Sequence, residues 1–236
     1  MKLFLTEWCI TVMTWLRKQK WWLLLNLLAL GIFIIVLTQG SINFNTTHTF
    51  DPGLASGKWG VRFLLLSLAM TPLNSYFGWR GAIRLRKPAG LWAFGFTAVH
   101  LLFYFLFYIE ENQFLRLIFS LQTFIVLGLL SFLLLSALAV TSNKWAMRRL
   151  KKNWKRLHRL VYLAGIFATF HAILATNASK RIFARDPDVL PELILYFLLL
   201  ILLLGVRIAF VRRVLQKMWA GLFFWQPQRN KMSSPS

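Results

Sequence analysis

Residues 89–109 read AGLWAFGFTAVHLLFYFLFYI, and this stretch decides the fold. It carries no Asp, Glu, Lys or Arg and, at about 20 residues, is as long as an α-helix needs to be to cross a bilayer. His100 is the one basic side chain in it. An imidazole in hydrocarbon is costly unless something binds it, so intramembrane ionisable residues are functional candidates. The stretch therefore predicts a membrane-spanning helix that carries a functional histidine.

Five further apolar segments accompany this one, and each is long enough to span a membrane. The six predicted crossings lie near 21–38, 59–78, 89–109, 115–140, 157–176 and 190–210. With 58% apolar and 16% aromatic residues among 236, the chain is too hydrophobic for a soluble domain. We therefore expect an all-α membrane protein, a six-transmembrane helix bundle.

The basic residues that give the net charge of +21 are distributed along the chain as the predicted topology requires. Lys and Arg gather in four clusters, at 2–20, 80–87, 144–159 and 207–231. With six crossings these clusters lie on one side, and the positive-inside rule puts that side and both termini in the cytoplasm. The charge is thus explained by topology, and nucleic-acid binding is not expected. The predicted parts are a cytoplasmic N-terminal segment (1–20), a six-helix domain (21–210) and a basic cytoplasmic tail (211–236).

The sequence offers no signature of a catalytic domain. It has no glycine-rich dinucleotide fingerprint and no Walker loop, and the tail is too short for a flavin or nicotinamide domain. Cys9 is the single cysteine, which excludes an internal disulfide and a four-thiolate iron–sulfur cluster. No catalytic residue is predicted, and a two-electron donor is expected to be another polypeptide or the quinone pool.

A second intramembrane histidine lies at nearly the depth of the first. His100 follows Pro88, where we expect the third helix to begin, by 12 residues, or about 18 Å of helix. His171 follows Leu157, at the start of the fifth helix, by 14 residues, or about 21 Å. A porphyrin between the two helices would take one imidazole on each face. Axial ligation of a haem iron by this pair is our main hypothesis. The alternative is two core histidines bonded to backbone or hydroxyl groups.

Two other residues are weaker candidates for cofactor binding. His158 lies about 20 Å from His171 along the helix, and a partner at its depth would fall at Arg86. His158 is a metal ligand with an unusual partner, a flavin contact, or a residue of the headgroup boundary. Arg62 near the outer start of the second helix is the best partner for a haem propionate, or else a snorkelling arginine that anchors the helix end.

Three pieces of the chain carry a family resemblance. They are GKWGVRFLLLSLAMTPL at 57–73, RLRKPAGLWAFGFTAVHLLFY at 84–104 and TSNKWAMRRLKKNWKRLHRLVY at 141–162, the last followed by His171. They resemble the MsrQ (YedZ) family, the haem-binding membrane subunits of the bacterial periplasmic protein-methionine-sulfoxide reductase. That family belongs to a wider ferric-reductase-like transmembrane group. Its three histidines match His100, His158 and His171.

The resemblance implies a multi-pass inner-membrane electron carrier with one haem b or two, and with flavin mononucleotide (FMN) as a further candidate cofactor. Electrons would come from a cytoplasmic flavin reductase or from quinone. They would pass to a periplasmic molybdopterin-containing subunit that reduces methionine sulfoxide in proteins. Membrane lipid is a further expected partner, because the basic run 148–156 is expected to attract anionic lipid headgroups or else an acidic cytoplasmic reductase.

Two other functions stay open at this point. A ferric or other metal reductase would use the same haem. A haem-free transporter or assembly factor would use the histidines as proton relays.

Overall fold

The computed structural model describes residues 2–43, 51–107, 122–178 and 189–207, and every regular element within these ranges is helical. The elements are α1 (Lys2–Asn43), α2 (Pro52–Phe77), α3 (Ala82–Phe107), α5 (Thr123–Val140), α6 (Lys144–Leu150), α7 (Lys152–Leu157), the 3-10 turn η1 (His158–Leu160), α8 (Val161–Ala178) and α10 (Val189–Gly205). The prediction of an all-α protein is confirmed.

Several helices have the length and composition of membrane spans. Among the described residues four stretches qualify, and they are Gln19–Gln39, Ala82–Leu106, Thr123–Val140 and Lys152–Thr176. Helix α10 is a shorter apolar helix, and α2, which carries two cations, is not among the four. A multi-pass membrane protein is thereby supported. The count of six crossings and the cytoplasmic position of both termini stay predictions.

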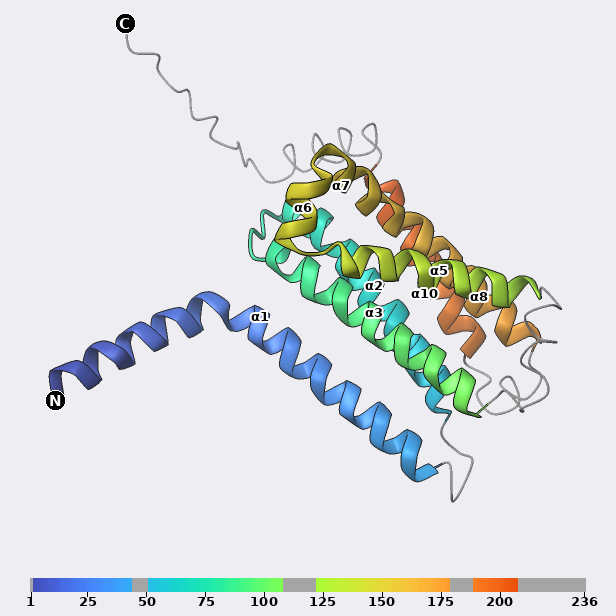
Figure 1. Cartoon of the computed structure of the whole chain (residues 1–236), viewed down its shortest axis with the longest axis horizontal. Coiled ribbons are helices and arrows are strands. Elements are labelled where there is room, and N and C mark those ends of the chain that lie inside the picture. Colours follow the sequence, from blue (N-terminus) through green and yellow to red (C-terminus); the bar gives the residue numbers. More distant parts are fainter. Residues whose placement is uncertain (1, 44–50, 108–121, 179–188, 208–236) are drawn as a thin grey trace, which may run out of the picture.

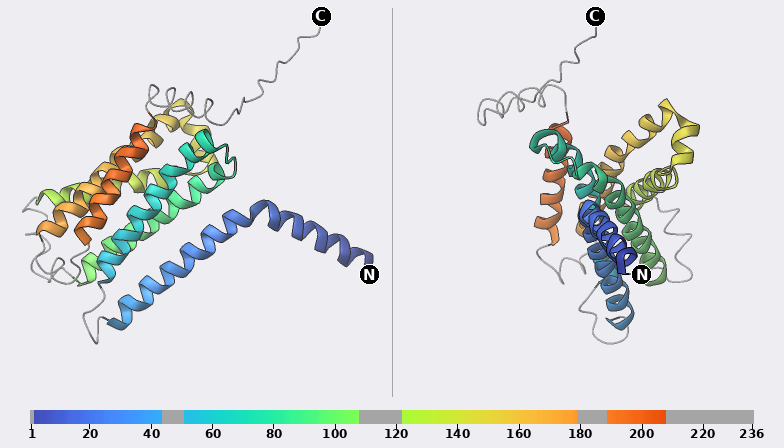
Figure 2. Two further views of the ribbon diagram at one scale, coloured as in Figure 1. Left: turned by 180° about the vertical axis from the view of Figure 1, so that it is seen from behind. Right: turned by 90° about the vertical axis from the view of Figure 1, so that its left-hand side faces the viewer.

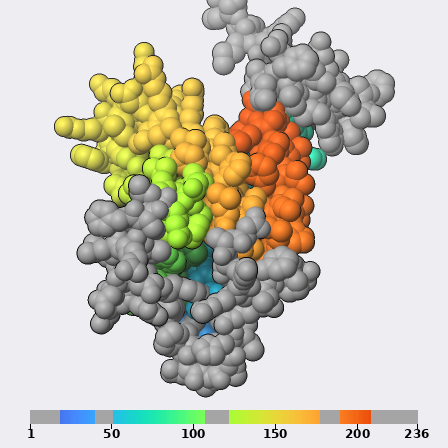
Figure 3. Space-filling model, turned by 90° about the vertical axis from the view of Figure 1, so that its right-hand side faces the viewer, coloured from blue at the N-terminus to red at the C-terminus, as the bar shows by residue number. Residues whose placement is uncertain are grey.

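The helices pack as two close pairs with two further helices beside them (Figure 1). Helix α2 packs most extensively against α3, and α5 packs against α8. Helix α10 contacts α8 and α2, while α1 lies along α3 and α2 (Figure 2). Figure 3 shows one face of the bundle, on which α8 lies between α5 and α10. Helix α3 also contacts α5, and α2 also contacts α8, so the helices that carry His100 and His171 belong to one group of four packed helices.

The bundle has two chemically different ends. One, the histidine end, holds the start of α2, α5 and α10 together with the last turns of α3 and α8. The other, the basic end, holds the turn between α2 and α3 and the short helices α6 and α7. Asn143 caps α6 by accepting a hydrogen bond from the amide of Ala146. The predicted basic loop at this end therefore folds into short helices, with most of its Lys and Arg side chains exposed.

The helix boundaries follow local chemistry, with one exception. Asp51 caps α2 by accepting from the amide of Leu54, Pro52 occupies the first turn, and Gly78 ends the helix in the left-handed conformation at φ 67°. Helix α3 begins at Ala82, so the expectation that it begins near Pro88 is wrong. Pro88 lies inside the helix, where it supplies no backbone donor.

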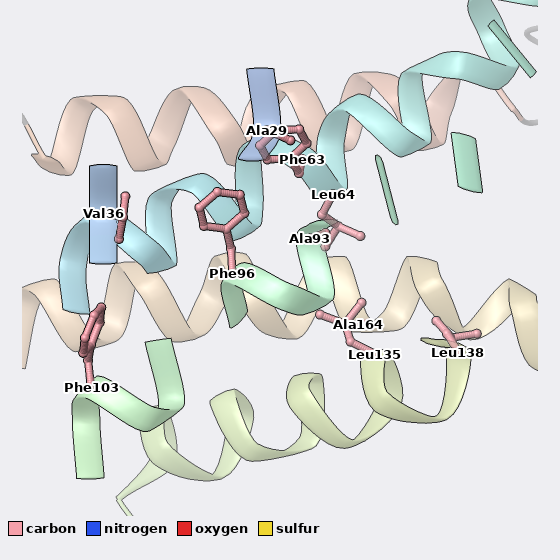
Figure 4. Packing of buried hydrophobic residues seen from close by; sticks show 10 residues of the cluster. All are labelled: Ala29, Val36, Phe63, Leu64, Ala93, Phe96, Phe103, Leu135, Leu138 and Ala164. Atoms are coloured by element: carbon pink, nitrogen blue, oxygen red, sulfur yellow. The ribbon is translucent and has the colours of Figure 1, made fainter. Parts of the chain in front are cut away.

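The core is aromatic where α1, α2 and α3 meet (Figure 4). Phe96 is fully buried and stacks on Phe63 with ring centroids 5.4 Å apart, while Phe33 of α1 meets it edge-on at 5.3 Å. Ala93 of α3 and Ala164 of α8 are also fully buried. Small residues at such positions let helix backbones approach closely, which is the usual way in which membrane helices pack.

Candidate functional site

His100 and His171 meet at the histidine end of the bundle. Their ring centroids are 6.0 Å apart, and the ring planes are inclined at 75°. One ring comes from α3 and the other from α8, as the matched depths predict. The structure thus brings the two main sequence candidates together. Their role as metal ligands stays a prediction.

Each imidazole is fixed by a backbone carbonyl. Nδ1 of His100 lies 2.7 Å from the carbonyl oxygen of Gly53, and Nδ1 of His171 lies 2.6 Å from that of Phe124. A carbonyl oxygen only accepts, so each Nδ1 carries the proton and donates it. In that tautomer Nε2 keeps its lone pair, which is the form in which a neutral imidazole binds a metal.

A glycine lies behind each ring. A Cβ atom at Gly57 would stand 3.1 Å from Nδ1 of His100, and one at Gly128 would stand 2.7 Å from Nδ1 of His171. A distance under 3.0 Å is shorter than real Cβ contacts, so the α5 position tolerates only glycine unless the ring moves. The rings therefore lie directly against the backbones of α2 and α5, which fixes their orientation.

The two halves of the site repeat the same construction. Each histidine follows its carbonyl partner by 47 residues, and each follows its glycine by 43 residues. The pattern Ala-x-x-Phe-x-x-x-His also occurs twice, at 93–100 and at 164–171. The helix pairs α2–α3 and α5–α8 are thus equivalent units. Neither glycine stands out in the sequence as a single residue. The repeated pattern and the equal spacing of 43 residues from glycine to histidine are the sequence features that point to both glycines.

Among the described residues, the donors that identify the site are these two imidazoles. In the part of the chain that the structure describes, no group of three or more His, Cys, Asp or Glu side chains is arranged to hold a metal ion. A metal bound by two imidazoles alone must take its other ligands from a non-protein group. A porphyrin, which supplies four in-plane nitrogens and leaves two axial positions, matches this donor set.

Arg62 belongs to an ionic cluster that ties α2 to α10. Its Nη2 lies 2.5 Å from a carboxylate oxygen of Glu192, and its Nε donates to the hydroxyl of Tyr196 at 2.6 Å. Lys58 binds the other oxygen of Glu192 at 2.6 Å, and the Tyr196 hydroxyl donates to the carboxylate. The guanidinium group of Arg62 also lies over the ring of Trp59 at 4.5 Å. Sequence inspection missed Glu192 and Tyr196, because their proximity to α2 depends on tertiary packing.

His158 lies apart from the histidine pair. It belongs to the 3-10 turn at the basic end, with its ring centroid 4.0 Å from that of Trp154. Its Nε2 is 3.4 Å from the Thr141 hydroxyl, and the indole nitrogen of Trp154 donates to the Thr141 carbonyl at 3.0 Å. In the described residues His158 therefore has an aromatic and a hydroxyl neighbour, and no second histidine beside it.

A cavity of about 520 Å³ lies on another part of the bundle, between α1 and α3. Its lining residues are Trp22, Asn26, Phe33, Lys87, Pro88, Leu91, Trp92 and Gly95. None of the sequence candidates lies there. The two imidazoles, which are the side chains able to bind a cofactor, converge at the histidine end and not at this cavity.

Comparison with known proteins identifies the family of this chain. Residues 56–180 match the model of the family described as "Ferric reductase like transmembrane component". No solved structure matches the chain.

Three curated relatives are each named "Protein-methionine-sulfoxide reductase heme-binding subunit MsrQ". The protein from Xanthomonas campestris pv. campestris (strain 8004) is 38% identical over 173 residues, which are 72% of this chain and 74% of the relative. The Bordetella pertussis protein is 38% identical over 160 residues, or 66% and 72% of the two chains. That from Xanthomonas euvesicatoria pv. vesicatoria (strain 85-10) is 42% identical over 119 residues, or 49% and 54%.

The family match spans Gly57 and Gly128 and also His100, His158 and His171, and the Xanthomonas campestris relative covers 72% of the chain. This chain therefore belongs to the ferric-reductase-like transmembrane family and, within it, to the family of MsrQ heme-binding subunits.

Proposed function

We propose that this chain is a haem b electron carrier of the bacterial inner membrane, with His100 and His171 as the axial ligands of one haem iron. The proposal rests on one observation: the imidazole rings of His100 and His171 lie close together, and Nδ1 of each is held by a backbone carbonyl. The names of the relatives, which are heme-binding subunits, support the same cofactor.

The spacing of the rings fits one iron between them. An imidazole nitrogen binds a first-row metal ion at about 2 Å, so two axial nitrogens stand about 4 Å apart. Each ring centre lies about 1 Å behind its nitrogen, which puts the centroids about 6 Å apart in such a complex. The observed separation is 6.0 Å. The separation of the ring centroids thus matches the value expected if both imidazoles held one iron.

The protein groups hold and orient the ligands. The carbonyl groups of Gly53 and Phe124 keep the Nδ1 protons in place and raise the basicity of each Nε2. Gly57 and Gly128 let the rings lie against the helices. A haem with two imidazole ligands has no open coordination position, so it transfers single electrons rather than activating dioxygen.

Arg62 is the proposed partner of a haem propionate. Lys58 and Arg62 both bind the carboxylate of Glu192. Two nitrogens of the guanidinium group are engaged with Tyr196 and Glu192, and the remaining nitrogen is available for a carboxylate. His158 is proposed as a contact of a second cofactor, a further haem or FMN, at the basic end.

Electrons would enter at the basic end, from a cytoplasmic flavin reductase or from quinone, and leave at the histidine end. The proposed acceptor is a periplasmic molybdopterin-containing subunit that reduces methionine sulfoxide in proteins. The distribution of Lys and Arg supports this orientation. The names of the relatives support the methionine-sulfoxide reductase system.

The test is haem content per polypeptide, measured as the pyridine haemochrome of purified protein. His100→Ala and His171→Ala should each remove most of the haem and abolish the Soret shift on dithionite reduction. His48→Ala, in a predicted outer loop, is the matched control and should keep its haem. Full haem content in both site variants would refute the ligand assignment. Reduction of ferric chelates, without electron transfer to a sulfoxide reductase, would favour the metal-reductase alternative.

A further inference from the structure

Arg207 occupies an unusual position at the basic end of the bundle. Its Nη2 donates to the carbonyl of Leu68 at 2.6 Å, and its Nη1 donates to the hydroxyl of Tyr162. The guanidinium group also lies over the Tyr162 ring at 4.9 Å. Pro72 explains the first bond: it has no N–H, so the carbonyl four residues earlier, that of Leu68, lacks its helical donor. Arg207 thus links α10 to α2 and α8.

A second arginine lies beside this one. The Ser67 hydroxyl donates to the carbonyl of Arg86 at 2.8 Å, so Arg86 meets α2 one residue before Leu68. Arg86 is partly buried and within electrostatic range of both Arg207 and Tyr162. None of the hydrogen bonds among the described residues involves the Arg86 guanidinium group. Two like charges therefore converge where α2, α3, α8 and α10 meet.

The chain provides no acidic partner for these arginines from the bundle around them. Its seven acidic residues are Glu7, Asp51, Glu110, Glu111, Asp186, Asp188 and Glu192. Asp51 and Glu192 lie at the histidine end. The ranges 52–109, 112–185 and 193–236 contain no Asp or Glu. They include every helix at this junction except the first four residues of α10, where Glu192 lies at the far end of that helix. Partly buried cations without a counter-ion are unfavourable, so an anion from outside the chain would stabilise them.

Several donors at the junction are unused. Within the described residues, Nε of Arg207 and the hydroxyl of Thr71 are buried and have no hydrogen-bond partner. Tyr162 accepts from Arg207, so its own hydroxyl proton is free to be donated. Buried donors without partners are rare in native proteins, and each one calls for an explanation such as an absent ligand. Nε of Arg207 and the Tyr162 hydroxyl proton can only be donated, and the Thr71 hydroxyl can donate as well, so a ligand rich in acceptor atoms matches these groups.

We propose that Arg86, Arg207 and Tyr162 form a binding site for a phosphate group, contributed by an anionic phospholipid headgroup or by a soluble phosphate ester. Guanidinium groups bind phosphate oxygens through paired hydrogen bonds. The site lies near the helix ends, where headgroup phosphates are found. A propionate of a porphyrin between His100 and His171 does not reach it, because Arg86 precedes His100 by 14 residues, or about 21 Å of helix. For the soluble ester the inference rests on the proposed function, since Arg86 is also within electrostatic range of His158 and FMN bound there would be such an ester.

The test compares four proteins purified in detergent and stripped of lipid: wild type, Arg86→Gln, Arg207→Gln and the control Arg84→Gln. Arg84 is exposed on α3, so the control makes the same charge change away from the site. Phosphatidylglycerol binding is measured by native mass spectrometry, and inorganic phosphate binding by calorimetry. We expect the two site variants to bind about tenfold or more weakly, and the control to match wild type.

The two arms identify the source of the phosphate. Binding of phosphatidylglycerol but not of inorganic phosphate assigns the site to a lipid; binding of inorganic phosphate that competes with the lipid assigns it to a soluble ester. If Arg207→Gln does not fold, Arg86→Gln carries the test. Equal binding by all four proteins, binding of neither ligand, or loss of haem rather than of phosphate binding in the site variants would overturn the proposal.

Discussion

Gly128 lies so close to the ring of His171 that a Cβ atom there would stand 2.7 Å from Nδ1 and 2.9 Å from Cε1. The imidazole therefore rests on the backbone of α5, where its Nδ1 donates to the carbonyl of Phe124, one turn before Gly128. Gly57 confines His100 in the same way, with a slightly larger distance of 3.1 Å. The orientation of both proposed ligands thus depends on two positions that have no side chain.

The first prediction concerns these glycines. Gly128→Ala should push the His171 ring out of line and weaken haem retention by about tenfold, the usual cost of disturbing the groups that orient a metal ligand. Gly57→Ala should have a smaller effect, because its neighbour needs to move only a few tenths of an ångström. The measurement is haem loss to apomyoglobin.

A control variant on α3 separates this effect from a general effect of alanine. A Cβ atom at Gly95 meets nothing within 4 Å, so Gly95→Ala should keep its haem and stabilise the helix slightly. Equal haem loss from Gly95→Ala and Gly128→Ala would contradict the proposed role of the glycine.

The second prediction concerns the ionic cluster. Glu192→Gln leaves Lys58 and Arg62 without their shared carboxylate. We therefore expect the free energy of unfolding in detergent to fall by about 2 kcal/mol. Arg62→Gln should also destabilise the protein, and the double variant should lose less than the sum of the two. Haem content separates the roles of Arg62. Loss of haem from Arg62→Gln but not from Glu192→Gln supports a propionate contact. If neither variant loses haem, the role of Arg62 is to connect α2 to α10.

The third prediction concerns two serines on α5. Ser131 is buried and donates to the carbonyl of Ala164 on α8 at 2.9 Å, whereas Ser136 donates to Phe132 within its own helix. Ser131→Ala should therefore destabilise the α5–α8 pair by about 1 kcal/mol, a common value for a hydrogen bond between membrane helices. Ser136→Ala should have almost no effect. If both variants lost the same free energy of unfolding, the hydrogen bond from Ser131 to Ala164 would not stabilise the α5–α8 pair more than a bond within one helix does.

The fourth prediction concerns His158. Because its ring rests on Trp154 at the basic end, His158→Ala should leave the haem held by the histidine pair in place. The reduced α-band of that haem should be unchanged, while any second cofactor is lost. Trp154→Phe keeps an aromatic ring against the histidine and is the matched control. Disappearance of the whole haem signal from His158→Ala would show that His158 belongs to the main site.

The sequence by itself determined the class of the protein and its main candidates. Long uncharged segments favour membrane helices because an unpaired backbone in hydrocarbon is costly, and the resemblance identified the family correctly. The depth of His100 and His171 followed from the constant rise of an α-helix, although the third helix begins at Ala82 rather than near Pro88.

Tertiary structure alone decided how the site is built. Helical rise gives the level of a residue in a bundle but not its direction around the helix axis or the identity of its neighbours. Only packing placed the carbonyl groups of Gly53 and Phe124 on the two imidazoles, and only packing joined Arg62 to Glu192 across more than a hundred residues. These contacts link segments far apart in the chain, and their partners are mostly backbone atoms, which every residue has and which no residue type reveals.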